Sequence, residues 1–388
     1  MKFHIGTILA AGAVVLVGLA GCRAQSGRDA GPRELRIGVI MPLTGSYAPY
    51  GKAVVCGMEL YGEKFARQHP DLRLRLITVD NHSTAEGSLA AYRKLVQKDK
   101  VPVVVGAYTS ANTFPLLPEV RKLKVPLITP TATHDGVTGH SPYVFRTCFN
   151  DSFQGEAMGR YLWRNVGIRK LGILWCLSAD DGDYSRDLGR HVMSAFMENK
   201  PNRVKTVGYN IGQKDFSSQL RELKDAGVEA VFAPLYPVDL ESFLPAAQAA
   251  GFLVFGSDSW SADGLLEKLG EAGDGCSYSC MFSPQYQKPQ VAAFVNFVRD
   301  RGLDPGVCLA QGFDTAGILA AIMNPSSTAE DIAEALPEVR NYPGVTGPTS
   351  IYEHGRTTKN VFIVKIVWDS VNRRPVRTLE YIIEPKSE

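Results

Sequence analysis

Two hydroxyl-rich segments of the chain each follow a short apolar run. Residues 106–110 (GAYTS) come after Val105, and residues 129–133 (TPTAT) come after Ile128. Ser110 stands where a helix is predicted to begin, and a carboxylate there would meet free backbone N–H groups and the positive end of the helix dipole. Hydroxyl groups from two such segments on neighbouring strands would converge on one anion, although helix capping alone would also explain Ser110.

The sequence carries no motif for covalent, metal or nucleotide chemistry. It contains no G-x-S-x-G, no Walker A segment, no CxxC, no HExxH and no paired Cys/His spacing. Those motifs place nucleophiles, phosphate-binding loops and zinc ligands at fixed spacings. The sequence therefore predicts a protein that is not an enzyme, with no catalytic residue, no cofactor and no metal.

Short apolar runs alternate with longer amphipathic stretches, which is typical of repeated strand–helix units and a parallel sheet. The predicted strands are 35–41, 74–79, 101–105, 126–129, 143–146, 171–175, 204–209, 230–233 and 253–255. The predicted helices between them are 51–67, 85–98, 153–165, 188–198, 216–226 and 240–250. Helices at 289–301, 310–323 and 328–336 and strands at 349–352, 361–367 and 376–382 follow. Ligands of such sheets bind beyond the carboxyl ends of the strands, where both hydroxyl-rich segments fall.

Length and composition narrow the class of protein. The chain has 388 residues, enough for two domains, with 42 Lys and Arg against 40 Asp and Glu and a formal net charge of +2. This balance gives no electrostatic footprint for nucleic acid. With 45% apolar and 21% charged residues, the chain resembles ordinary globular domains and not a disordered or polytopic membrane protein.

The first residues predict a secretory signal with a lipid attachment site. Every residue from 8 to 21 is apolar or glycine, a stretch shorter than the roughly 20 residues that span a bilayer. It ends in Leu-Ala-Gly before Cys22, which resembles the lipobox of bacterial lipoproteins. We expect a signal peptide over 1–21, acylation of Cys22 and a flexible tether over 22–33. An uncleaved anchor helix or an ordinary signal peptide is the alternative.

Six further cysteines leave the disulfide pairing open. They are Cys56, Cys148, Cys176, Cys276, Cys280 and Cys308. An even number in an extracytoplasmic chain permits bridges in 15 connectivities. Cys276 and Cys280 frame a strand-like segment, which separates them by roughly 13 Å and makes them unsuitable partners. Buried free thiols are the default expectation.

Several motifs, in order along the chain, resemble the type I periplasmic binding proteins for branched-chain amino acids, the Leu/Ile/Val-binding proteins of ABC importers. They are residues 37–51 (IGVIMPLTGSYAPYG), Val105-Gly106 with Ser110, 128–133 (ITPTAT), 214–217 (KDFS) and 247–251 (AQAAG). The resemblance extends from Leu35 to about Trp368. It implies an α/β fold of two Rossmann-like lobes with central parallel sheets, joined by three crossovers. The implied lobes are 34–149 with 281–357 and 150–280 with 358–388.

The resemblance also implies a set of ligand-binding residues. The carboxylate-binding serine matches Ser110, and the loop that holds carboxylate and ammonium matches Thr131, Ala132 and Thr133. The acidic partner of the ammonium matches Asp258. Second-lobe aromatic residues match Tyr184 and Tyr236, and a variable position that contacts the ligand side chain matches Tyr47.

Two departures from the family pattern bear on the ligand. Asp258 stands where glutamate is usual, so the ligand lies deeper or the site leaves room for a larger or amide-bearing ligand. Ser185 follows Tyr184 where glycine is usual. A turn at Asp258 and half-buried surface positions for the tyrosines are the simpler explanations of these residues.

The function that follows is an extracytoplasmic, lipid-anchored substrate-binding component of an ABC importer. It would capture a small amino acid or amide between its lobes, close, and deliver the ligand to permease subunits in the membrane. We expect a monomer without nucleic-acid partners. The alternative is a ligand-sensing module that signals to a receptor or regulator without transport. An enzyme using Asp258 or His134 as a base is the least favoured reading.

Overall fold

The computed structural model describes residues 31–178, 182–197, 203–261 and 264–385. The predicted signal peptide, Cys22 and almost all of the tether lie outside these residues. None of the helices in the described part of the chain combines the length and apolar character needed to cross a membrane.

A five-stranded parallel sheet forms from the first third of the described chain, in the order β2-β1-β3-β4-β5. Its strands are β1 (Arg33–Met41), β2 (Leu72–Asp80), β3 (Val104–Val105), β4 (Leu127–Thr129) and β5 (Val144–Arg146). The helices that follow its strands are α1 (Ala48–Gln68), α2 (Ala85–Arg93), α3 (Ser110–Thr113) and α4 (Leu117–Leu123).

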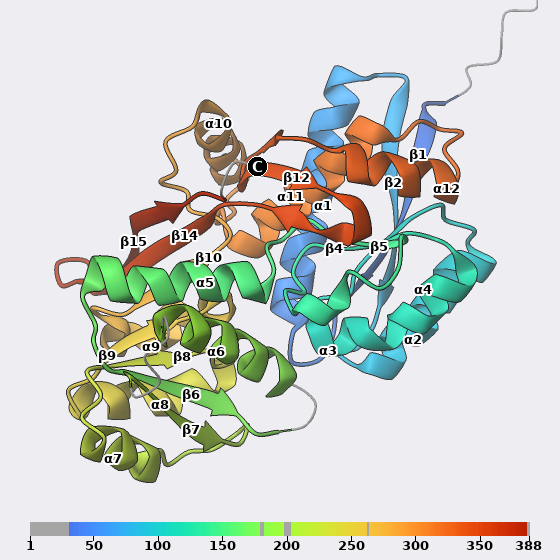
Figure 1. Ribbon diagram of the computed structural model, residues 1–388. Helices are drawn as coiled ribbons and strands as arrows, with labels where there is room; N and C mark the ends of the chain where they lie inside the picture. Colours follow the sequence, from blue (N-terminus) through green and yellow to red (C-terminus); the bar gives the residue numbers. More distant parts are fainter. Residues whose placement is uncertain (1–30, 179–181, 198–202, 262–263, 386–388) are drawn as a thin grey trace, which may run out of the picture.

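Both faces of this sheet are buried, which explains its continuous apolar strands. On β1, Ile37 and Val39 belong to the core shared with α1, whereas Ile40 belongs to the core shared with α2 and α4. The helix α11 (Val307–Ile322), far along the chain, packs against α1 (Figure 1). A Cβ on Gly57 or on Gly312 would lie about 2.0 Å from a carbonyl oxygen of the other helix, so only glycine permits this close approach.

A second, seven-stranded sheet has the order β15-β14-β10-β9-β8-β6-β7. Its strands are β6 (Leu171–Cys176), β7 (Val204–Tyr209), β8 (Ala230–Ala233), β9 (Leu253–Gly256), β10 (Ser277–Cys280), β14 (Val361–Asp369) and β15 (Arg374–Ile383). Strands β6 to β10 pair in parallel, and β14 joins antiparallel to β10. Helix α5 (Asp151–Tyr161) precedes β6, and the helices that follow strands of this sheet are α6 (Gly182–Met197), α7 (Ser217–Asp225), α8 (Pro237–Ala249) and α9 (Leu265–Leu269).

The remaining elements connect and complete the two sheets (Figure 1). They are α10 (Pro289–Arg299), α12 (Ala329–Ala335) and a three-stranded sheet of β11 (Tyr342–Gly344), β12 (Gly347–Ile351) and β13 (Thr357–Thr358). Because β14 and β15 return to the second sheet from beyond β13, the chain passes between the sheets more than once. Two lobes with parallel sheets are therefore confirmed. The exact lobe boundaries stay a prediction.

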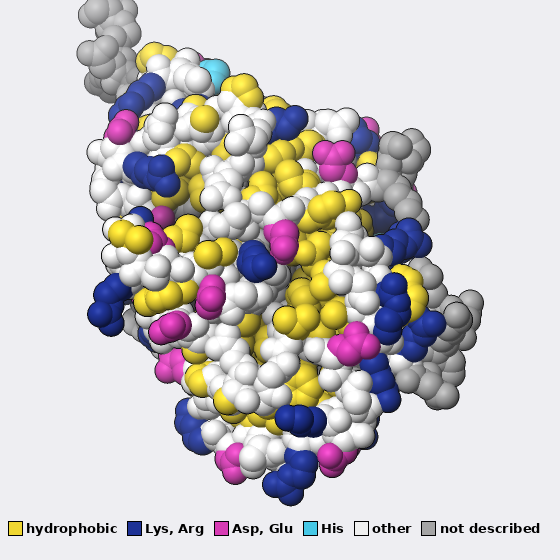
Figure 2. All heavy atoms as spheres, turned by 90° about the vertical axis from the view of Figure 1, so that its left-hand side faces the viewer, with side chains coloured by type: hydrophobic (Ala, Val, Ile, Leu, Met, Phe, Trp, Pro, Cys, Tyr) yellow, Lys and Arg dark blue, Asp and Glu magenta, His cyan; other side chains and the backbone are white. Residues whose placement is uncertain are grey.

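Nearly all predicted elements are present with ends shifted by a few residues. The largest differences are β3, which is only Val104–Val105, and α6, which begins at Gly182 instead of residue 188. Tyr184 is therefore on a helix and not in a loop. The six cysteines within the described residues are all free thiols, and five of them are buried. Figure 2 shows acidic and basic side chains interspersed over one face of the molecule, as the balanced composition leads one to expect.

Candidate ligand-binding site

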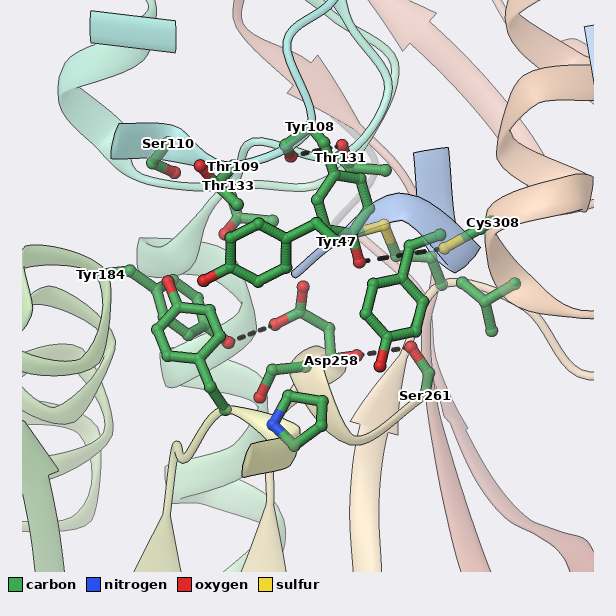
Figure 3. Close-up of a pocket in the computed structure, with 16 residues that line it drawn as sticks. Tyr47, Tyr108, Thr109, Ser110, Thr131, Thr133, Tyr184, Asp258, Ser261 and Cys308 are labelled. Atoms are coloured by element: carbon green, nitrogen blue, oxygen red, sulfur yellow. Dashed lines mark hydrogen bonds between the residues drawn. The ribbon is translucent and has the colours of Figure 1, made fainter. Parts of the chain in front are cut away.

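A pocket lies between the carboxyl ends of the strands of the two sheets, which is where ligands of such sheets bind (Figure 3). The first lobe contributes residues from α1 and from the segments after β3 and β4. The second lobe contributes residues from the start of α6, the start of α8 and the short helix η6 (Asp258–Ser261) after β9. Such convergence of loops from two sheets is what a binding cleft requires.

Seven of the eight predicted ligand-binding residues line this pocket. They are Tyr47, Ser110, Thr131, Thr133, Tyr184, Tyr236 and Asp258. Ala132 does not: its side chain is buried in the core, and its backbone N–H donates to Thr129 Oγ1 at 2.9 Å. The structure thus brings the hydroxyl groups and the carboxylate together but turns Ala132 away.

Asp258 is held by donors from two other elements. The Tyr184 hydroxyl donates to Asp258 Oδ1 at 2.6 Å, and Gln154 Nε2, on α5, donates to the same oxygen at 2.8 Å. Burial raises the pKa of Asp258, while the hydrogen bonds from Tyr184 and Gln154 oppose that rise. A cation in the pocket would give this desolvated carboxylate the opposite charge that it lacks.

Three of the hydroxyl groups that line the pocket donate their protons to backbone carbonyl oxygens. Thr131 Oγ1 donates to Tyr108 O at 2.6 Å, Ser259 Oγ donates to Leu235 O at 2.7 Å, and Ser261 Oγ donates to Asp258 O. A carbonyl oxygen can only accept, so each hydroxyl is left with lone pairs alone. Toward a ligand, these three side chains act as acceptors.

Ser110 has the opposite character. Its hydroxyl accepts the backbone N–H of His134 at 3.3 Å, so its own proton is available to a ligand. The prediction that Ser110 caps the following helix is wrong: the N-cap is Thr109, whose side chain accepts from Asn112 N at 3.1 Å. Freed from capping, Ser110 supplies a donor to the pocket.

A row of five tyrosine rings runs along the pocket wall. Neighbouring ring centroids are 5.7 Å apart for Tyr50 and Tyr108, 5.8 Å for Tyr108 and Tyr47, 6.2 Å for Tyr47 and Tyr236, and 5.6 Å for Tyr236 and Tyr184. The contact between Tyr47 and Tyr236 joins the two lobes. These spacings are those of favourable aromatic pairs.

The sequence reasoning missed several lining residues, namely Tyr50, Tyr108, Thr109, Pro237, Ser259, Ser261, Met281, Val307 and Cys308. Some had a signal: Tyr50 lies one helical turn after Tyr47, and Ser259 directly follows Asp258. Val307 and Cys308 come from α11 and had none. With one carboxylate and one thiol, the lining offers too few ligands for a metal ion.

The chain matches a known family over most of its length. The family model described as "Periplasmic binding protein" matches residues 34–371. The Leu/Ile/Val-binding protein BraC3 of Rhizobium johnstonii is 25% identical over 340 residues, which are 85% of this chain and 90% of that protein.

Solved structures have the same fold. The leucine-binding protein LivK of Thermotoga maritima is 28% identical, with a TM-score of 0.81 over 90% of this chain and 99% of that one. An ABC transporter solute-binding protein of Rhodopseudomonas palustris, in complex with 3,4-dihydroxybenzoic acid, is 21% identical with a TM-score of 0.76, over 90% of this chain and 97% of that one. At that identity the second likeness shows the fold alone.

The family match, the two-lobed parallel-sheet fold and the pocket between the sheets agree with one another. The protein is a substrate-binding protein and not an enzyme, and its family is one that acts outside the cytoplasm. The chain belongs to the periplasmic binding proteins, in the type I group of the branched-chain amino acid-binding proteins.

Proposed function

We propose that this protein captures a small amino acid or amide, similar to a branched-chain amino acid, for an ABC importer and delivers it to the permease. One observation carries the proposal. The only carboxylate among the lining residues, Asp258, shares one tyrosine-walled pocket with the available hydroxyl donor of Ser110. The ammonium of a zwitterion needs a negative partner and its carboxylate needs hydrogen-bond donors, and the pocket offers both.

Each end of the ligand has a partner of the right kind. An α-ammonium would pair with Asp258 and donate to the lone pairs of Thr131 and Ser261, both committed to backbone carbonyl oxygens. An α-carboxylate would accept from Ser110, whose proton is available. The five tyrosine rings would surround an apolar side chain. The names of the relatives, for leucine and for Leu/Ile/Val, support the same ligand class.

An aromatic acid is the competing ligand class, because a solved neighbour holds 3,4-dihydroxybenzoic acid. Stacking between tyrosine rings would suit such a ligand. Asp258 argues against it, because an anionic ligand brings no cation to a desolvated carboxylate. The amino acid therefore remains the better fit.

A thermal-shift panel tests the ligand class directly. The ligands are the 20 amino acids, their small amides and hydroxybenzoic acids, each with the purified mature protein. A ligand at 100 times its Kd should stabilise the folded state by about 2.7 kcal/mol. We expect the largest shift from an apolar amino acid or its amide. A shift with the aromatic acids alone would overturn the amino acid assignment, and no shift with any compound would overturn the ligand class.

Membrane attachment forms the second part of the proposal. We infer that residues 1–21 are removed, that Cys22 is acylated, and that 22–33 tether lobes with the boundaries 34–149 with 281–357 and 150–280 with 358–388. The membership of β14 and β15 in the second sheet supports those boundaries. Cys22→Ala should move the protein from the membrane fraction to the soluble fraction of cells. A variant that stays with membranes would overturn the lipid anchor.

A further inference from the structure

A cluster of charged side chains links the lobes outside the ligand pocket. Asp135 begins a short helix, η3 (Asp135–Val137), in the segment after β4 of the first lobe. Its Oδ2 lies 2.9 Å from His191 Nε2, on α6 of the second lobe. His191 Nε2 also lies 3.6 Å from Asp187 Oδ1, one turn earlier on the same helix. None of these residues lines the pocket.

A second contact runs alongside the first. His134 Nε2 lies 3.7 Å from Asp187 Oδ2, and the backbone N–H of Asp135 donates to the same oxygen at 3.5 Å. His134 Nδ1 accepts the N–H of Gly136 at 2.9 Å, which places the proton of a neutral ring on Nε2, facing Asp187. Two residues of the first lobe thus meet two residues of the second.

One face of α6 carries both the ligand contact and this cluster. Tyr184, Asp187 and His191 are at positions i, i+3 and i+7, which lie on the same side of a helix. Tyr184 reaches Asp258 in the pocket, while Asp187 and His191 reach the first lobe. A movement that separates α6 from the first lobe would break the contacts of Asp187 and His191 with that lobe. It would also carry Tyr184, with its second-lobe partner Asp258, away from the first-lobe side of the pocket.

Other charged groups surround His191 without competing for its ring. Glu156 and Arg160 of α5 share a surface hollow with His191 and form their own ion pair at 2.6 Å. Asp151, at the start of α5, is buried and interacts electrostatically with Asp135 and Asp187. Asp135 is fixed by Ser152, whose N–H donates at 3.1 Å. The surroundings are predominantly acidic and favour a positive charge on His191.

We propose that His191, with Asp135 and Asp187, acts as an interlobe latch that sets ligand affinity by stabilising the closed arrangement. This inference rests on the proposed function in one respect, namely that the lobes separate when the ligand is absent. Contacts in the pocket and contacts in the latch both stabilise the closed state. A ligand's affinity rises with the fraction of protein that is in the binding-competent state, so the latch increases affinity. Residues that never touch the ligand then change its Kd.

The test measures closure with and without a ligand in the full mature protein. Small-angle X-ray scattering of ligand-free His191→Gln should show a larger mean radius of gyration than the parent. With L-leucine as the first calorimetric probe, Kd should rise roughly three- to tenfold, the range for one or two partly exposed ion pairs. His140→Gln, an exposed histidine of the same lobe segment as Asp135, is the matched control and should behave as the parent.

Asp187→Asn provides a second, independent variant. It removes one charge of the latch and should open the ligand-free protein in the same direction. Thermal unfolding checks that both variants fold. If the radius of gyration of both folded variants equals that of the parent, the latch is wrong. If treatment with EDTA opens the parent protein to the same extent, a bound cation and not the His191 charge links the lobes, and the latch is also wrong. Because the scattering test uses no ligand, its result is independent of which compound the pocket binds.

Discussion

The two sides of the pocket bury polar groups in different ways. The first lobe offers neutral groups, namely the Ser110 and Thr133 hydroxyls and three tyrosine rings, whereas the second lobe offers the charge of Asp258. Burial raises the pKa of Asp258, and the hydrogen bonds that Tyr184 and Gln154 donate favour the ionised form of its carboxylate. A neutral donor needs no such support. The second lobe therefore carries the part of the site that is most sensitive to change.

The largest effect is expected where the buried charge is removed. Asp258→Asn keeps the shape of the side chain but leaves the ligand's ammonium without a counter-charge, which should weaken binding by about 2–5 kcal/mol in calorimetric titration. Asp304→Asn, whose carboxylate side chain is 77% exposed, is the matched control and should bind as the parent. Parent-like affinity of Asp258→Asn would contradict the charge difference between the lobes.

A smaller loss is expected on the neutral side. Ser110→Ala removes a hydroxyl donor from the proposed carboxylate end and should weaken binding by about 1–3 kcal/mol. Isothermal titration measures the change, with the exposed Ser218→Ala as the control. If Ser110→Ala costs more than Asp258→Asn, the first lobe dominates recognition and the comparison is reversed.

The support of Asp258 can be tested separately from its charge. Gln154 is fully buried and its Nε2 donates to Asp258 Oδ1 at 2.8 Å and to Ser279 Oγ at 2.9 Å. Gln154→Ala should weaken binding by about 1 kcal/mol, the typical net value of one hydrogen bond. The pH profile of binding should also shift upward, because Asp258 would hold its proton more tightly without that donor. An unchanged profile would show that Gln154 supports the fold alone.

The smallest effect concerns the contact between the lobes. Hydrogen bonds to Asp135 and then to Asp187 raise the pKa of His191 to about 10 in the closed structure, against about 6.5 for a free histidine. Because the pKa of His191 is higher when the lobes are in contact than when they are apart, closure takes up a proton between about pH 6.5 and pH 10. The latch contributes fully below about pH 6.5 and is lost as the pH rises through about 10.

The measurement for this prediction is the difference in Kd between the parent protein and His191→Gln across that pH window. The difference should shrink as the pH rises. The affinity of His191→Gln itself should change with pH only through the titration of other groups. A difference that is constant from pH 6 to pH 10 would show that the charge of His191 does not contribute.

Much of the fold was predictable because buried parallel strands produce continuous apolar runs. The predicted strand at 204–209 has the same bounds as β7, and the predicted strand at 230–233 has the same bounds as β8. The predicted strand at 101–105 was longer than β3, because Val101 is buried but donates its N–H to Leu95 O and not to a neighbouring strand. Apolar character reports burial, and only hydrogen-bond geometry reports pairing.

The site was predictable in part, for a related reason. Residue types at strand ends indicated Ser110, and the family resemblance indicated Asp258. The acceptor to which each hydroxyl donates its proton depends on carbonyl groups that the sequence does not place. Likewise, Thr109 and not Ser110 caps α3, because the Thr109 side chain accepts the N–H of Asn112. The proposed latch had no signal in the sequence, because Asp135 and His191 are 56 residues apart and are brought together by the packing of α6 against the first lobe.

The hydroxyl groups of Thr131, Ser259 and Ser261 give the pocket a preference that charge alone would not. Their protons point at backbone carbonyl oxygens, so these three groups meet a ligand with lone pairs only. Of two ligands that differ in one group, an amide nitrogen there would find acceptors, whereas the corresponding acid would face lone pair against lone pair. Backbone carbonyl oxygens would thereby favour an amide ligand over the acid that its hydrolysis releases.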